Sequence, residues 1–185
     1  MNDQFAFLSP IAAELSSKDV PKAQPKITPS DIDLLYNHLK TPGIENIANE
    51  AYWDKVAGVW TVGVGQTGNG ITKGTKWTDE QIRADFDKRA MANRAILEQQ
   101  YGTVFNSMTD KQKMVVQSLL WNAGPAALDN WPKMRAAMMT TDKAKVADAI
   151  RVFSQEIPTI RKSGGKVVKG LENRRAIEKK MFDEQ

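Results

Sequence analysis

The sequence contains no cysteine and only one histidine, His38. Without cysteine there can be no disulfide framework, no zinc site built on thiolates and no thiol nucleophile. A single histidine also excludes a metal site with several histidine ligands. We therefore expect any hydrolytic chemistry to rest on carboxylates and hydroxyls. His38 shares a helical pattern with Leu35 and Leu39, so we expect it to be structural.

Long apolar runs are missing as well. No stretch reaches the roughly 18 consecutive apolar residues of a membrane span. The apolar residues 5–15 are interrupted by Pro10 and Glu14 and follow a start without basic residues, which is not typical of a secretory signal. Residues 1–29 hold four of the eight prolines. We expect this segment to be a tail or linker that either docks on another protein or packs on the domain.

The remaining composition is that of an ordinary globular domain. The 185 residues are 41% hydrophobic and 26% charged, which excludes a disordered polyelectrolyte and a membrane bundle. The 26 basic and 22 acidic residues leave a net charge of +4, which suits a polyanion such as nucleic acid, an anionic membrane or a bacterial wall polymer. Basic residues are interspersed with acids instead of forming one stripe, which argues against nucleic acid.

Helix signals recur along most of the chain. Ser30 is a typical N-cap for a helix that Pro42-Gly43 ends or distorts. Capping-box patterns begin helices at Thr78, extending to about Gln100, and at Thr109, extending to Ala123 before Gly124-Pro125. Later helices are predicted over about 131–139, 142–156 and 170–183, with a flexible loop over 163–166.

A different pattern lies between residues 53 and 70. Trp60, Val62 and Val64 alternate with Thr61, Gly63 and Gly65. This period of two, with five glycines from 58 to 70, predicts a small antiparallel β unit. The fold class is therefore α+β and mostly α, with a small β-containing lobe before a larger helical lobe, in one domain over residues 30–185.

Two acids near this unit are candidates for catalysis. Glu45 precedes Asp54 by nine residues, and Thr61 follows seven residues later. Hydrolysis of a glycosidic bond needs an acid to protonate the leaving oxygen and a second carboxylate on the opposite face. A Glu at a helix end and an Asp on a neighbouring strand suit that arrangement. The spacing alone is weak evidence, because the chain has 22 acids, and Glu50 is a rival.

Three blocks of sequence resemble phage-type lysozymes, the endolysins of glycoside hydrolase family 24. ENIANEAYWD with GVWTVGVGQT is similar to their signature of Glu, eight residues, Asp, five residues and Thr. SLLWNAGPAAL at 118–128 resembles the start of their helical-lobe cleft. GGKVVKGLENRRAIEKKMF at 164–182 resembles their C-terminal G-L-x-x-R-R-x-x-E-x-x-x-F stretch. The resemblance implies a two-lobed lysozyme-like catalytic domain.

The resemblance also implies roles for individual residues. Glu45 would be the general acid, and Asp54 would stabilise the developing cation and place the water together with the Thr61 hydroxyl, with inversion at the anomeric carbon. We prefer Glu45 to Glu50 because the register through Tyr52 and Asp54 fixes it. The spacing from Asp to Thr is one residue longer than in the family pattern.

Supporting residues follow in the same way. Arg174 matches the position whose guanidinium contacts the catalytic Glu. Trp121 and Asn122 fall where the family lines its cleft with an aromatic and an amide, although Trp121 fits a helical core equally well. Gln66 stands in place of the usual histidine of the glycine turn.

The function implied is that of a muramidase, which hydrolyses the β-1,4 bond between N-acetylmuramic acid and N-acetylglucosamine in peptidoglycan. The resemblance implies no metal ion and no organic cofactor. We expect a monomer that acts on this anionic polymer in the periplasm or cell wall, without nucleic acid or stable membrane insertion. It would be made in the host cytoplasm and released by a holin, or carried in a virion. Two alternatives remain: a non-catalytic glycan-binding or virion module with the same fold, and a nucleic-acid-binding helical protein.

Overall fold

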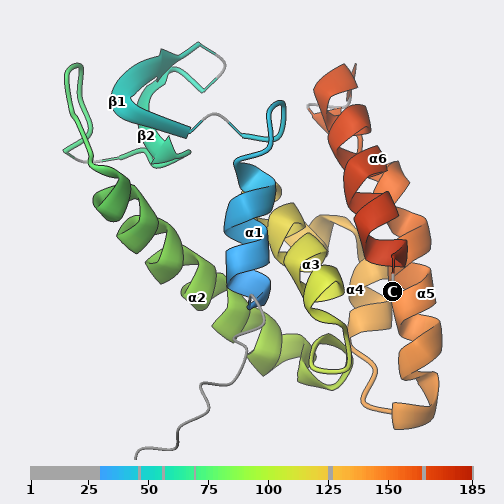
Figure 1. Cartoon of the computed structure of the whole chain (residues 1–185). Helices are drawn as coiled ribbons and strands as arrows, with labels where there is room; N and C mark the ends of the chain where they lie inside the picture. The colour runs from blue at the N-terminus through green and yellow to red at the C-terminus, as the bar shows by residue number, and fades with distance from the viewer. Residues whose placement is uncertain are drawn as a thin grey trace, which may run out of the picture.

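Figure 1 shows the computed structural model, which describes residues 30–45, 47–55, 57–68, 70–124, 127–163 and 166–184. The predictions for residues 1–29 lie outside these ranges. The helices are α1 (Asp31–Leu39), α2 (Asp79–Phe105), α3 (Asp110–Ala123), α4 (Pro132–Met138), α5 (Val146–Glu156) and α6 (Lys169–Asp183). The strands are β1 (Ile47–Asp54), β2 (Val59–Val64), β3 (Lys162–Ser163) and β4 (Lys166–Val167). Short 3₁₀ turns occupy Ala127–Asn130, Lys143–Lys145 and Ile157–Thr159.

The predicted α+β class is confirmed. Strands β1 and β2 form one antiparallel pair and β3 and β4 form another, while helices make up most of the described chain. The β1–β2 hairpin lies beyond the N-terminal end of the long helix α2, and the other helices gather along and around its far end (Figure 1). Of the residues described, none belongs to a helix long and apolar enough to cross a bilayer.

Local sequence signals account for the helix ends. Reciprocal capping boxes begin α1 at Ser30, α2 at Thr78 and α3 at Thr109. Helix α3 ends at Gly124, whose φ of 88° suits glycine. Helix α2 continues to Phe105, beyond the predicted end near Gln100. The backbone of Tyr101 is non-helical there (φ −132°, ψ 20°), so the predicted end coincides with a kink.

The hairpin begins earlier than predicted, at Ile47, and it contains a bulge. Ala48 pairs with Gly63 and Tyr52 with Thr61, so the three residues 49–51 lie opposite one residue of β2. These residues bond to a third segment instead: Ala51 N–H donates to the Thr75 carbonyl and Trp77 N–H to the Asn49 carbonyl, both at 2.8 Å. A bulge of this kind bends its strand. The alternation of apolar and small residues that marks β2 in the sequence is therefore absent from β1.

The core joins the helices through aromatic side chains. Phe86 of α2 is fully buried, with ring centroids 4.9 Å from Tyr36 of α1 and 5.0 Å from Trp121 of α3. Phe153 of α5 stacks on Phe182 of α6 at 5.4 Å. Burial of such rings is the main stabilising contribution in a domain of this size.

The loop predicted over residues 163–166 was only partly right. Lys162 and Ser163 pair with Val167 and Lys166 as two-residue antiparallel strands, and residues 164 and 165 of the predicted loop lie outside the described ranges. Strands this short have no readable periodicity, which is why the sequence predicted only a loop.

The hairpin glycines offer a test of backbone strain. Gly63 has φ +62°, and an added Cβ would lie 3.2 Å from two ring atoms of Trp77. Gly58 has a similar φ of +69° but nothing within 4 Å of an added Cβ. Gly58→Ala should therefore lower the free energy of unfolding by about 1–2 kcal/mol, the ordinary left-handed cost. Gly63→Ala should cost more in urea denaturation. Equal losses would show that Trp77 does not constrain the hairpin.

Candidate active site

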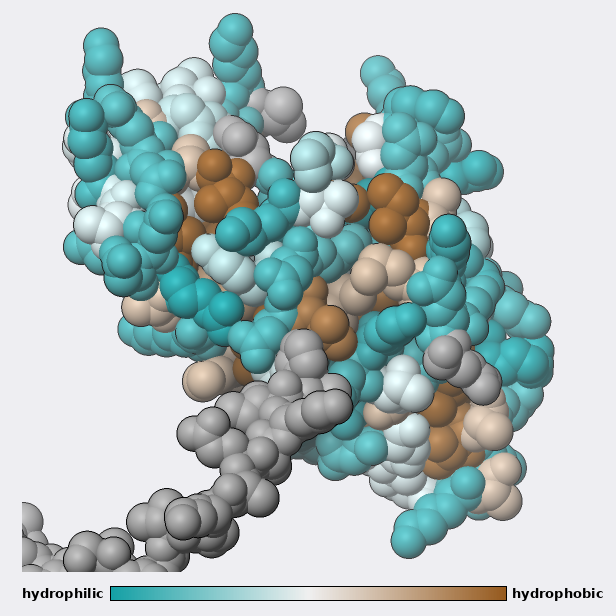
Figure 2. Space-filling model, in the orientation of Figure 1, coloured by the Kyte–Doolittle hydropathy of each residue, from teal (hydrophilic) through white to brown (hydrophobic). Residues whose placement is uncertain are grey.

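Glu45 lies in the loop that joins α1 to β1. The expectation that it sits at a helix end was wrong, because α1 ends at Leu39 and its C-cap is Lys40. This loop lies between the β1–β2 hairpin and α6 (Figure 1). Figure 2 shows a notch in the molecular outline between these two ends of the molecule. The Glu45 side chain is 23% exposed, and its Oε1 accepts a hydrogen bond of 2.6 Å from Arg174 Nη1.

Arg174 of α6 is buried and donates in several directions. Besides Glu45, its Nη1 donates to the Ile44 carbonyl at 3.3 Å. Its Nη2 donates to the carbonyl and the hydroxyl of Ser118 at 3.3 and 3.0 Å, and its Nε donates to Glu178 Oε1 at 3.0 Å. One guanidinium therefore joins the loop, α3 and α6. The planar fork of arginine suits this, because it presents five fixed donors.

Glu178 is the fully buried anion of this cluster. Its Oε1 accepts from Ser118 Oγ at 2.6 Å and from Arg174, and its Oε2 accepts from Arg175 Nη1. The buried Nε2 of His38 lies 3.8 Å from Oε1, too far for a hydrogen bond. Burial alone would raise the pKa of Glu178, but the charges of the two guanidiniums and the hydrogen bond from Ser118 outweigh burial and lower that pKa to about 2.

Arg175 bonds to Asn122 as well as to Glu178. Its Nη2 donates to Asn122 Oδ1 at 2.6 Å and its Nε to the Ile160 carbonyl at 3.1 Å. Burial is the main reason that the pKa of Arg175 falls below its usual range, against the opposing charge of Glu178. Because Oδ1 is taken, the exposed Asn122 has its NH₂ group left to donate. We name the residues His38, Ser118, Arg174, Arg175 and Glu178 the arginine cluster.

Asp54 and Thr61 lie on the hairpin. Asp54 ends β1, and its Oδ1 accepts from Ala57 N–H at 3.0 Å. Register pairs Asp54 with Val59 and Tyr52 with Thr61, so Asp54 and Thr61 share one face of the hairpin. In a regular ladder such diagonal neighbours are about 7–8 Å apart. Thr61 is only 3% exposed, and its hydroxyl has no hydrogen-bond partner within the described ranges.

Glu50, the rival acid, has a different environment. It lies in the bulge of β1, and its exposed carboxylate is 3.3 Å from the exposed ammonium of Lys76. An ion pair this exposed contributes little to the free energy of unfolding. The structure therefore brings Arg174 to Glu45 and leaves Glu50 in a surface pair.

Trp121 of α3 is half-buried. The Arg89 guanidinium lies 4.3 Å from its ring centroid, and Phe86 packs on it as well. Arg89 also donates to the Val64 carbonyl at 3.0 Å, which ties α2 to the end of β2. Trp121, Arg89 and Asn93 help to line a pocket of about 320 Å³. Trp121 therefore packs on Phe86 and Arg89 and also contributes to the wall of this pocket.

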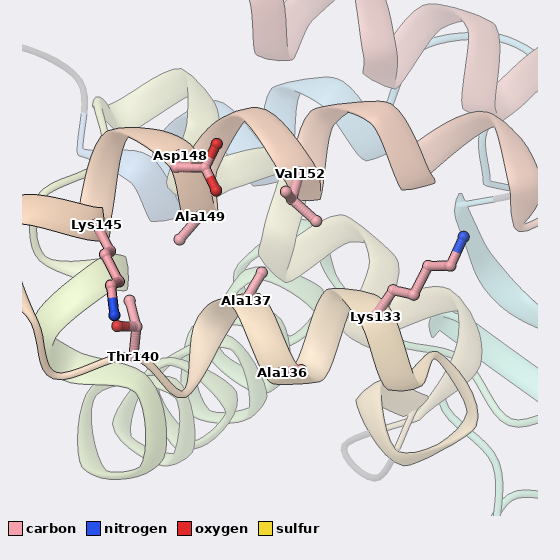
Figure 3. A pocket seen from close by; sticks show the side chains of 8 residues that line it. All are labelled: Lys133, Ala136, Ala137, Thr140, Lys145, Asp148, Ala149 and Val152. Atoms are coloured by element: carbon pink, nitrogen blue, oxygen red, sulfur yellow. The ribbon is translucent and has the colours of Figure 1, made fainter.

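A second pocket, of about 430 Å³, lies between α4 and α5 (Figure 3). Its walls are mostly alanine and the stems of Lys133 and Lys145, with Asp148 as its acid. It contains no residue of the arginine cluster. In the described part of the chain, no group of three or more His, Asp or Glu residues is placed to hold a metal ion.

The comparison with known families agrees with this architecture. Residues 43–178 match the family model described as phage lysozyme, which covers Glu45 and the arginine cluster except His38. The chain belongs to the phage lysozyme family. It is therefore a glycoside hydrolase of the lysozyme type that acts on bacterial peptidoglycan, and the prediction of an enzyme is confirmed.

Individual relatives are consistent with this assignment. The SAR-endolysin of Escherichia phage P1 is 30% identical over 128 residues, which cover 68% of each chain. The SAR-endolysin of Haemophilus phage HP1 is 33% identical over 128 residues, 66% of each chain. The solved endolysin of Escherichia coli O157:H7 phage FAHEc1 superposes with a TM-score of 0.59 at 21% identity, over 88% of this chain and 97% of that chain. The lysozyme fold predicted from the sequence is thereby confirmed.

Sequence reasoning missed three members of the arginine cluster as site residues: Ser118, Arg175 and Glu178. All three lie inside the blocks that carry the resemblance. The available signal was the spacing of Glu178, three and four residues after the two arginines, which places it on their helix face. His38 was expected to be structural, and its burial in the cluster agrees with that.

The lowered pKa of Glu178 makes the stability of this lysozyme pH-dependent. Its stabilising contribution is complete above the ordinary value of 4.5 and is lost as the pH falls towards about 2, because only the unfolded chain takes up the proton in that interval. Urea denaturation across that interval should show a shallower pH dependence for Glu178→Gln than for the native chain. The control Glu172→Gln removes a partly exposed acid of the same helix, which pairs with Lys169 at 3.6 Å, and should keep most of the dependence.

Proposed function

We propose that this lysozyme cleaves the β-1,4 bond between N-acetylmuramic acid and N-acetylglucosamine with Glu45 as general acid. The observation that carries the proposal is the 2.6 Å hydrogen bond from Arg174 to Glu45 Oε1. It fixes the carboxyl group by one oxygen. Among the described residues Oε2 has no partner, so Oε2 is the oxygen that holds the proton for the leaving group.

Asp54 and Thr61 act on the water in this proposal. Their shared face of the hairpin supports a joint role, in which the Asp54 carboxylate stabilises the developing cation and helps to place the water. The Thr61 hydroxyl is buried without a partner within the described ranges, so it retains an unused donor and acceptor. Attack from this side, opposite the acid, inverts the anomeric centre.

The other residues hold the substrate. Asn122 donates its NH₂ group to the glycan, because Arg175 occupies its carbonyl oxygen. Trp121 supplies an apolar wall beside it. The enzyme acts as a monomer at the peptidoglycan of the periplasm or cell wall, without nucleic acid or stable membrane insertion. Both curated relatives are named SAR-endolysins, which supports an export-related route and action in the periplasm and favours neither release by a holin nor carriage in a virion.

The acid can be identified by matched substitutions. Glu45→Gln keeps the size of the side chain but has no proton to give, so release of reducing ends from isolated peptidoglycan should fall by about 10²–10⁴-fold. Glu50→Gln, the control, should release them at the native rate. Native activity in Glu45→Gln, or loss confined to Glu50→Gln, would overturn the assignment.

The stereochemistry of the product tests whether water attacks the anomeric carbon directly. NMR of a soluble peptidoglycan fragment, recorded before mutarotation, should show the α-anomer as the first reducing end. Asp54→Asn should slow its formation. A β-anomer would instead require a nucleophile on the enzyme, with carboxyl groups about 5–5.5 Å apart.

A further inference from the structure

A single buried carboxylate holds two neighbouring arginines that lead to different parts of the site. Glu178 Oε1 binds Arg174 Nε, and its Oε2 binds Arg175 Nη1. Arg174 Nη1 donates a hydrogen bond to Glu45, and Arg175 Nη2 donates one to Asn122. The acid and the substrate amide, which come from a loop and from α3, therefore have one common anchor on α6.

Helix geometry explains why an anchor is needed. Arg174 and Arg175 are consecutive, so their side chains leave α6 about 100° apart. Glu178 is four residues after one and three after the other, the two spacings that share a helix face. It therefore lies between the two guanidiniums and limits both to one direction. Both arginines are almost completely buried, which removes solvent as an alternative partner.

Stability alone gives little reason for this arrangement. Replacing a buried ion pair by apolar side chains of similar volume is often neutral or stabilising. The cluster also leaves His38 Nε2 buried at 3.8 Å from Glu178 without a hydrogen bond. The arginine cluster is more readily explained by its contacts with Glu45 and Asn122, which it can orient.

The charges around Glu45 give a second reason. Among the described residues, the groups that contact Glu45 or Glu178 are Arg174 and Arg175 from α6, His38 from α1 and the neutral Ser118 from α3. A general acid must hold its proton until the bond breaks. Two guanidiniums without an anion would favour ionised Glu45, which has no proton to give. The negative charge of Glu178 offsets one of them.

We propose that Glu178 is a positioning residue of this lysozyme, which orients Glu45 through Arg174 and Asn122 through Arg175 and keeps the acid protonated by offsetting their charge. The inference rests on the proposed role of Glu45. It assigns Glu178 no contact with substrate.

The pH profile of kcat on a soluble peptidoglycan fragment separates this role from a purely structural one. In Glu178→Gln the side chain keeps its size and loses its charge. The alkaline limb of the profile, where kcat falls as Glu45 loses its proton, should therefore move down by about one pH unit. At pH values above that limb, kcat should be about tenfold lower than in the native enzyme. The control Glu172→Gln removes an acid of the same helix that pairs with Lys169 outside the arginine cluster. This control should leave the limb in place.

Arg175→Gln tests the same proposal with the opposite sign. It removes the cation that Glu178 offsets, so the limb should move up, and it frees Asn122, so KM should rise several-fold. This variant decides the matter if Glu178→Gln does not fold. An unmoved limb in a folded Glu178→Gln, or an unchanged limb and KM in Arg175→Gln, would overturn the proposal. Activity in Glu45→Gln would instead overturn the role of Glu45 itself.

Discussion

The hydrogen-bonded ion pair of Arg174 with Glu178 is the interaction on which the site depends. It is buried between α3 and α6, and the same guanidinium continues to the loop that carries Glu45. Breaking such a pair leaves an uncompensated charge in the interior, typically at a cost of about 3–5 kcal/mol. The loop between α1 and β1 has no helix or strand of its own at Glu45, so its geometry comes from this side chain.

The hairpin side of the site depends on two other contacts. The bulge in β1 allows the segment around Thr75 and Trp77 to bond to residues 49–51, which leads the chain directly to the N-cap of α2 at Thr78. Arg89 of α2 then donates to the carbonyl of Val64 at the end of β2. The hairpin is therefore attached to α2 through both of its strands: β1 bonds to the segment just before the helix, and β2 bonds to Arg89. Asp54 and Thr61 lie on a unit fixed by backbone hydrogen bonds, whereas Glu45 is fixed by a side chain.

This difference explains how much of the molecule could be predicted from its sequence. The helices were readable because Ser30, Thr78 and Thr109 act within one turn of the chain. Strand β1 was placed too late, because its bulge removes the alternation on which strand prediction relies. Spacing alone made Glu45 and Asp54 two weak candidates among 22 acids, and only the family resemblance singled them out and pointed to Arg174.

The arginine cluster illustrates what remained hidden. The sequence shows Glu178 as one acid among several in a charged helix. Its importance comes from complete burial and from partners on three helices, and both are products of tertiary packing. In the same way, the sequence left Trp121 between core and cleft, and only the tertiary structure shows that it packs on Phe86 and Arg89 and also lines a pocket.

The distribution of charge completes the argument. Arg174 and Arg175 are matched within the site by Glu178 and by Glu45 in its ionised form, so the surplus of +4 belongs to the rest of the chain. Salt screens exposed charges over about 10 Å and buried ones much less. Attraction to an anionic wall polymer and the ion pairs of the arginine cluster therefore depend on separate sets of charges. The first varies with ionic strength, and the second lies in the interior, where Glu178 bonds to both guanidiniums.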